Sequence, residues 1–176
     1  MLGGTIIGTE FFLSGCKSDR TKVNDLFTAE DVVLLNEIGE TILPETATPG
    51  AKAANVGKFM VLMVNDCYTP EEQKIFTKGM AALQERSDKK YGKTFMELDT
   101  RQKTELLTAL DQEQKEETKN KQAQAFVHYF RMMKELTLLG YFTSEVGCTK
   151  ALRYIPVPGK YVGCIPYRKG DKAWAT

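Results

Sequence analysis

Apolar residues recur at helical spacing through most of this chain, and helix start and stop signals separate one run from the next. The clearest start is Thr69-Pro70-Glu71-Glu72, which combines a Thr cap, a Pro at the first helical position and a Glu three residues after the cap. No run alternates apolar and polar residues as a half-buried strand would. The pattern therefore predicts an all-α fold, arranged as an irregular helical bundle.

The first three expected helices are separated by prolines. One begins at the cap Thr28 and stops at Pro44, a second covers about residues 53–67, and a third starts at Thr69. The apolar positions expected to face inward are Val32, Leu35, Ile38, Gly39, Ile42, Ala53, Val56, Met60, Met63, Val64, Cys67, Ile75, Phe76, Gly79, Met80 and Leu83.

The two later helices are expected on either side of residue 121. A fourth begins at Asp99 or Thr100 and continues into the charged run 111–121, which we interpret as a solvated helical face with i,i+4 ion pairs. A fifth covers about residues 122–139, and Gly140 can end it. Their inward positions are Leu106, Leu107, Leu110, Phe126, Phe130, Met133, Leu136 and Leu139.

The C-terminal segment, residues 148–176, which we call the strap, differs from the rest in composition. From residue 150 onward it holds six Lys or Arg residues against a single acid, Asp171. Three prolines remove backbone donors, so this segment is expected to lie extended across the folded bundle. Tyr, Trp and Arg are the residues that anchor interfaces. The pattern is equally compatible with a partner interface and with packing on the chain's own domain.

The N-terminal residues 1–16 have the size of a signal peptide and are too short to span a bilayer. They end in Leu13-Ser14-Gly15-Cys16, which resembles a bacterial lipoprotein box, so Cys16 is the expected lipidation site. Residues 17–26 are then a tether, and residues 27–176 form one helical domain that includes the strap. Because no basic segment precedes the apolar run, we expect the start to be truncated; a twin-arginine signal would fit the missing piece. The expected compartment is the cell envelope.

Three cysteines remain beyond Cys16, and an oxidising compartment would favour a disulfide between two of them. Cys67 with Cys164 and Cys148 with Cys164 are both possible pairs. A tetrahedral metal site is a poor interpretation, because the chain has one histidine and no Cys-x-x-Cys. The formal net charge of +1 gives no indication of nucleic-acid binding.

Catalytic motifs are hard to find in this sequence. It contains no dinucleotide-binding Gly motif, no Walker loop, no haem-attachment motif and no nucleophile elbow. His128 lies among aromatic residues on the expected fifth helix, where a buried, hydrogen-bonded role is favoured over a catalytic one. An enzyme built on Glu145, His128 and Arg153 in a hidden pocket remains an alternative.

Five segments closely resemble the gluconate 2-dehydrogenase subunit 3 family. They are Leu35–Pro44, Asp66–Glu71, Leu136–Gly147, Leu152–Tyr161 and Ala173-Trp174. The resemblance implies a cofactor-free accessory subunit of a periplasmic, membrane-associated dehydrogenase for a sugar or glycoside. The catalytic large subunit would be a flavoprotein of the glucose-methanol-choline type that carries FAD, and a c-type cytochrome with haem c would accept the electrons. The small subunit would carry the export signal, bring the folded flavin subunit across the membrane and stabilise it.

The resemblance also suggests roles for particular residues. Because Cys67 and Cys164 both lie in segments that look like the family, it favours that disulfide over the pairing with Cys148. The expected contacts with the flavoprotein are Tyr141, Phe142, Glu145, Arg153, Tyr154, Tyr161, Tyr167 and Trp174. A free-standing envelope lipoprotein that binds a ligand or tethers another protein is the further alternative.

Overall fold

The computed structural model of the chain describes residues 22–120, 127–157, 159–160 and 162–175. Within these ranges the elements are α1 (Ala29–Ile42), α2 (Val56–Cys67), α3 (Pro70–Tyr91), the 3₁₀ turn η1 (Phe95–Glu97), α4 (Thr100–Asn120), α5 (Tyr129–Phe142) and the π-helical turn η2 (Gly147–Ala151). The described part contains isolated β-bridges and no strand. The predicted all-α class is therefore confirmed. No described helix is both long and apolar enough to traverse a bilayer.

Local capping chemistry explains where α1 and α3 begin. The Thr28 and Thr69 side chains each accept a hydrogen bond from the backbone N–H three residues later, and the carboxylates of Asp31 and Glu72 accept the cap N–H groups in return. Both capping boxes satisfy donors that would otherwise lack partners. At the far end of α3, Gly92 ends the helix in the left-handed conformation, with φ of 65°.

The fifth helix differs from its prediction at both ends. It begins at Tyr129, because His128 is its cap: the His128 Nδ1 accepts the Phe130 N–H at 3.2 Å. The expected start at residue 122 and Phe126 lie outside the described residues. The helix also continues through Gly140, because that residue packs closely against Phe59 of α2, and a Cβ there would lie 2.6 Å from the Phe59 ring. Leu139, expected to face inward, is 47% exposed.

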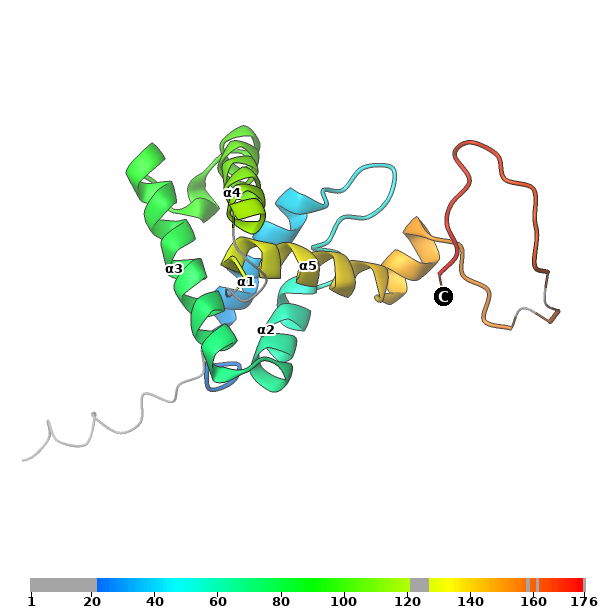
Figure 1. Cartoon of the computed structure of the whole chain (residues 1–176), viewed down its shortest axis with the longest axis horizontal. Coiled ribbons are helices and arrows are strands. Elements are labelled where there is room, and N and C mark those ends of the chain that lie inside the picture. Colours follow the sequence, from blue (N-terminus) through cyan, green and yellow to red (C-terminus); the bar gives the residue numbers. More distant parts are fainter. Residues whose placement is uncertain (1–21, 121–126, 158, 161, 176) are drawn as a thin grey trace, which may run out of the picture.

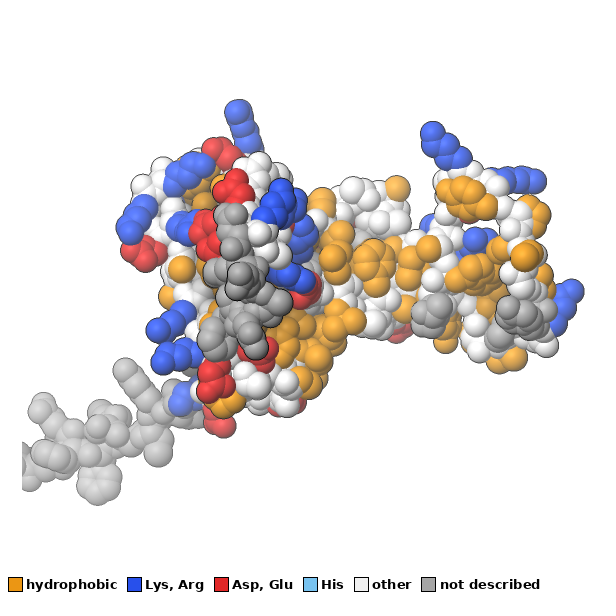
Figure 2. Space-filling view, in the orientation of Figure 1, with side chains coloured by type: hydrophobic (Ala, Val, Ile, Leu, Met, Phe, Trp, Pro, Cys, Tyr) orange, Lys and Arg blue, Asp and Glu red, His pale blue; other side chains and the backbone are white. Residues whose placement is uncertain are grey.

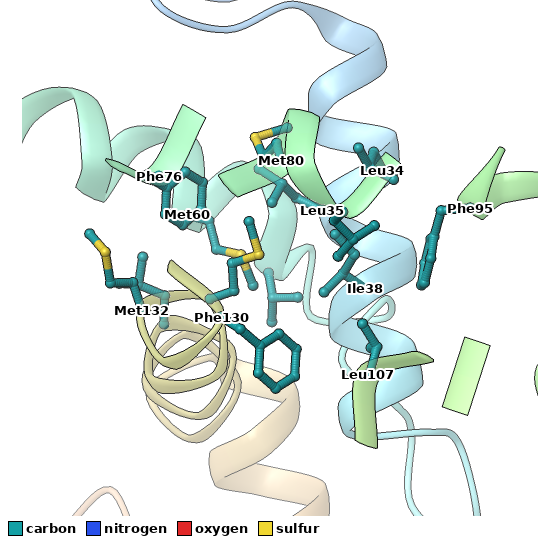
Figure 3. Packing of buried hydrophobic residues seen from close by; sticks show 14 of the residues in the cluster. Leu34, Leu35, Ile38, Met60, Phe76, Met80, Phe95, Leu107, Phe130 and Met132 are labelled. Carbon is teal, nitrogen blue, oxygen red and sulfur yellow. The ribbon is translucent and has the colours of Figure 1, made fainter. Parts of the chain in front are cut away.

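The core is formed where all five long helices meet. Met60 of α2, Phe76 of α3, Leu110 of α4 and Phe130 of α5 are buried together with Leu35 of α1. Figure 3 shows side chains from α1, α2, α3 and α5 converging on this centre, with Phe95 of η1 at its edge. Close packing of this kind fixes the direction in which each helix leaves the core.

Helices α1 and α2 approach each other almost backbone to backbone. Gly57 of α2 is buried, and a Cβ there would lie 2.7 Å from the backbone N of Asn36 on α1. Asn55, which precedes α2, makes no side-chain cap. Instead, the Asn36 Oδ1 accepts the Gly57 N–H at 2.8 Å. One of the N-terminal donors of α2 is therefore satisfied by a side chain of another helix.

Helices α4 and α5 are joined by a shared carboxylate. The Asp111 carboxylate on α4 accepts hydrogen bonds from Lys115, one turn further on, and from Lys134 of α5, each with an N–O distance of 2.6 Å. The ion pairs with these two lysines, Lys115 first, lower the pKa of Asp111 to about 2, and its side chain is only 19% exposed. The charged run is therefore helical, as predicted, but it also makes a tertiary contact.

The strap projects beyond the C-terminal end of α5 and away from the bundle (Figure 1). We had expected it to lie across the folded body. Its first residues form η2, and every described residue from Tyr154 to Trp174 is exposed. The described residues of the strap therefore leave the surface of the bundle uncovered in this structure.

Replacing Asn36 with Ala should lower the free energy of unfolding by about 1–3 kcal/mol, because the buried Gly57 N–H then loses its acceptor. Chemical denaturation of both proteins measures this difference. The matched control is Asn65→Ala, which removes an amide whose one side-chain hydrogen bond to a described residue is with its neighbour Asp66. This change should lower the free energy of unfolding by less than about 0.5 kcal/mol. Equal effects from the two variants would contradict the capping role of Asn36.

Replacing Asp111 with Asn should lower the free energy of unfolding by about 1 kcal/mol at pH 7, and by progressively less as the pH falls from about 4 to 2. The folded pKa lies below the unfolded one, so the stabilisation is complete above the unfolded pKa and disappears as the carboxylate is protonated in the folded state. Denaturation curves at pH 7 and at about pH 2.5 test this. The control at pH 7 is Asp88→Asn. Asp88 is an exposed residue of α3 that forms no ion pair with any described residue. If the difference in free energy of unfolding between wild type and the Asp111 variant is the same at low pH as at pH 7, the prediction is wrong.

Candidate partner interface

The turn η2 links the end of α5 to the strap. The Ser144 hydroxyl donates to the Tyr141 carbonyl at 2.6 Å and accepts the Gly147 N–H at 3.0 Å. Gly147 is required at this point, because a Cβ would overlap the Tyr141 carbonyl oxygen. The strap therefore starts from a fixed position at the end of α5.

Arg153 closes the strap into a loop. Its N–H donates to the Ala173 carbonyl and its own carbonyl accepts the Ala175 N–H, both at 2.8 Å. The Arg153 Nε donates to the Lys172 carbonyl at 2.7 Å, and the guanidinium lies over the Trp174 ring, 4.6 Å from the ring centroid. Cation–π stacking and hydrogen bonds thus hold the two ends of the loop together.

The closed loop exposes large apolar side chains at a high density. Seven such residues are Tyr154, Ile155, Val157, Val162, Ile165, Tyr167 and Trp174. Val157 is 80% exposed and Tyr167 is 76% exposed. Ile155, Val162, Ile165 and Trp174 contribute to the lining of a hollow of about 910 Å³ inside the loop. Apolar surface gathered in this way marks an interaction site.

The apolar surface continues from the strap onto α5. Leu138, Leu139 and Phe142 are exposed near the C-terminal end of that helix. Figure 2 shows orange side chains along α5 and again on the strap. The candidate interface, defined as the strap together with these three residues, therefore includes a rigid helical part and a projecting loop.

The predicted interface residues fall into three groups. Phe142, Glu145, Tyr154, Tyr167 and Trp174 are exposed, and Arg153 is half-buried because it closes the loop. Tyr161 lies outside the described residues, as does the predicted lipidation site Cys16. The sequence analysis missed Ile155, Val157, Val162, Ile165, Leu138 and Leu139. The signal that could have identified the four strap residues of this group is the occurrence of apolar residues between the prolines of the strap.

Tyr141 has a different place from the one predicted. It is only 4% exposed, and its hydroxyl donates to the Pro49 carbonyl at 2.6 Å. This bond ties α5 to the connection between α1 and α2. Tyr141 therefore stabilises the bundle and offers no side chain to a partner in this structure.

The cysteines predicted to pair are free thiols. Cys67 ends α2 in the bundle, whereas Cys164 lies in the projecting strap, and both are exposed; Cys148 is half-buried. Neither predicted disulfide is formed in this structure.

The three residues of the enzyme alternative are not brought together. His128 precedes the first residue of α5, while Glu145 and Arg153 follow its last residue. A helix of 14 residues is about 20 Å long. These side chains therefore do not form a joint acid–base site.

His128 instead lies near two carboxylates of α4. One atom from each of Glu113, Glu117 and His128 can be chosen so that all three lie within 4.8 Å of one another. The Glu113 carboxylate is held by Arg86 of α3 through two hydrogen bonds, and this pairing lowers its pKa. Since the His128 Nδ1 accepts the Phe130 N–H, the neutral ring carries its proton on Nε2, which lies 3.8 Å from Glu113. The arrangement fits a link between α3, α4 and α5 better than a metal site.

A comparison with known protein families finds one whose description is gluconate 2-dehydrogenase subunit 3, and it matches residues 29–159. The chain belongs to this family. No match is found among curated proteins or among solved structures. The matched range covers the bundle and the first part of the strap. Cys164 and Trp174 lie beyond it, so the match gives no support to the Cys67–Cys164 pairing.

Replacing Arg153 with Ala should open the loop of this family member without affecting its bundle. Loss of the Nε bond and of the stacking on Trp174 should speed amide exchange at Ala175 by about tenfold. Hydrogen–deuterium exchange resolved by residue measures this, and amides of α1–α5 should be unchanged. The control is Arg168→Ala, which removes a strap guanidinium that makes no hydrogen bond to any described residue. Unchanged exchange at Ala175 in the Arg153 variant would show that the backbone alone closes the loop.

Proposed function

We propose that this chain is the non-catalytic accessory subunit of a membrane-associated, FAD-dependent dehydrogenase, and that the candidate interface docks onto the catalytic subunit. The family name describes one subunit of a dehydrogenase. The observation that carries the proposal is the strap: seven large apolar side chains stand exposed on a loop that projects from a complete bundle. The proposed partner is a flavoprotein of the glucose-methanol-choline type.

Burial of this surface supplies the driving force for association. Exposed Tyr and Trp side chains gain most when a partner covers them, because they bury a large area and lose little conformational entropy. The Arg153 closure reduces the entropy that binding must still remove, since the two ends of the loop are already held together. Both effects favour a stable complex over a transient encounter.

The proposal places the redox groups in other chains. FAD would belong to the catalytic subunit, which would oxidise a sugar or glycoside, and haem c would belong to an electron-accepting cytochrome. Choice of substrate would rest with the flavoprotein.

The proposed location is the periplasmic side of the cell envelope. Cys16 would carry the lipid anchor, and residues 17–26 would link it to the bundle. Figure 1 draws the strap on the other side of the bundle from the blue segment that precedes α1. Anchoring and docking would therefore use separate parts of the chain. Export of the folded catalytic subunit together with this one would follow from a complex formed before translocation.

Affinity purification of the tagged chain from its native envelope tests the proposal. The expected result is a complex with a large oxidoreductase chain and a flavin absorption band near about 450 nm. Mass spectrometry identifies the partner, and turnover should be found in the complex and not in the isolated small subunit. A colourless, solitary chain, or one that turns over a sugar by itself, would overturn the proposal.

Replacing Tyr167 with Ala should weaken the complex by about 2 kcal/mol, or roughly 30-fold in Kd, because this ring has the exposure expected of an anchor. Titration calorimetry with the flavoprotein subunit measures the change. Met96→Ala is the matched control, since Met96 is 40% exposed on η1, away from the candidate interface. Circular dichroism should show the same helicity for both variants. If the Tyr167 variant binds like wild type, the strap does not anchor the complex.

A further inference from the structure

The strap carries positive charge that no described residue neutralises through an ion pair. Lys160, Arg168 and Lys169 are exposed, and none forms an ion pair with any described residue. Asp171, the strap's single acid, accepts the Arg168 backbone N–H through its carboxylate at 2.9 Å. Figure 2 shows Lys and Arg side chains standing out from the strap around its apolar ones. A partner surface would therefore meet apolar contacts framed by cations.

The strap backbone is also largely unpaired. No described residue between Tyr154 and Tyr167 makes a backbone hydrogen bond with another described residue. Pro156 and Pro166 lack an N–H, but the other described residues of this stretch are exposed and keep a backbone donor and acceptor for which no described residue is a backbone partner. An extended, unpaired backbone is the surface to which a second extended segment adds by main-chain hydrogen bonds.

We propose that the strap receives an extended, acidic segment of the catalytic subunit. The segment would place apolar side chains in the 910 Å³ hollow, set Asp or Glu residues against Lys160, Arg168 and Lys169, and pair its main chain with the strap. This inference rests on the proposed function and adds the chemistry of the partner surface. It predicts association that weakens as salt screens the charges.

A protein segment fits this surface better than a bilayer does. Backbone groups that enter hydrocarbon without partners cost several kcal/mol each, and the described residues from Tyr154 to Tyr167 have no backbone partner among the described residues. Ile155, Val162 and Ile165 also line the inside of a loop, whereas a membrane-binding surface presents its apolar side chains outward. An acidic protein segment satisfies the charges, the hollow and the backbone at once.

The charge part of the proposal is tested with Lys160→Glu combined with Lys169→Glu. We expect Kd for the purified flavoprotein subunit to rise at least about tenfold in 50 mM NaCl, and the difference from wild type to narrow in 200 mM NaCl. Lys74→Glu combined with Lys78→Glu makes the same charge change on two exposed residues of α3 and should leave Kd within about twofold. Equal weakening by both pairs would overturn the assignment to the strap.

The apolar part is tested with Val162→Lys, which adds attraction for an acidic partner while removing an apolar contact from the hollow. We expect binding to weaken at least about fivefold despite the added charge. Val33→Lys on α1 is the control, because Val33 is 52% exposed and Val162 is 51% exposed. Tighter binding by the Val162 variant would refute insertion into the hollow.

Two further outcomes separate this inference from the function on which it rests. If wild-type chain binds the flavoprotein subunit and all strap variants bind equally well, the inference fails and the proposed function stands. If wild-type chain does not bind it at all, the proposed function fails as well. Vesicles of phosphatidylethanolamine and phosphatidylglycerol are the competing probe: if the Lys160 and Lys169 changes abolish vesicle binding and leave flavoprotein affinity unchanged, the strap is a membrane contact and the inference is overturned.

Discussion

The close contact between α1 and α2 is the constraint on which the remaining arrangement depends. Gly57 brings the two backbones together, and Asn36 supplies the hydrogen bond that the start of α2 lacks. With α2 held there, Phe59 meets Gly140 and fixes the line of α5. Since the strap leaves from the end of α5 through η2, its direction follows from a contact between two other helices.

The sequence predicted the features that depend on neighbouring residues, and it failed where contacts between distant residues determine the structure. Thr28 and Thr69 lie within three residues of the groups they satisfy, so the starts of α1 and α3 were predictable. Gly140 has the local character of a helix end, but packing against Phe59 makes it a helix interior. Tyr141 has the residue type of an interface anchor, and a carbonyl 92 residues earlier in the chain makes it part of the bundle.

The same limit applies to the candidate interface. Prolines and basic residues showed that the strap is extended, because these are properties of the residues themselves. Whether it would cover the bundle depended on how much apolar surface the helices leave open, which no local pattern reveals. The contact between Arg153 and Trp174, which closes the strap, likewise joins residues about 20 positions apart. The sequence alone predicts an exposed cation and an exposed ring at these positions.

The hydrogen bond from Tyr141 to Pro49 has a mechanical consequence. In the proposed complex, a pull on the strap would act on the end of α5, where Tyr141 is the last residue but one. The hydrogen bond would pass part of this pull to the connection between α1 and α2. A force on the strap would then be distributed over α1, α2 and α5 instead of separating α5 alone from the bundle.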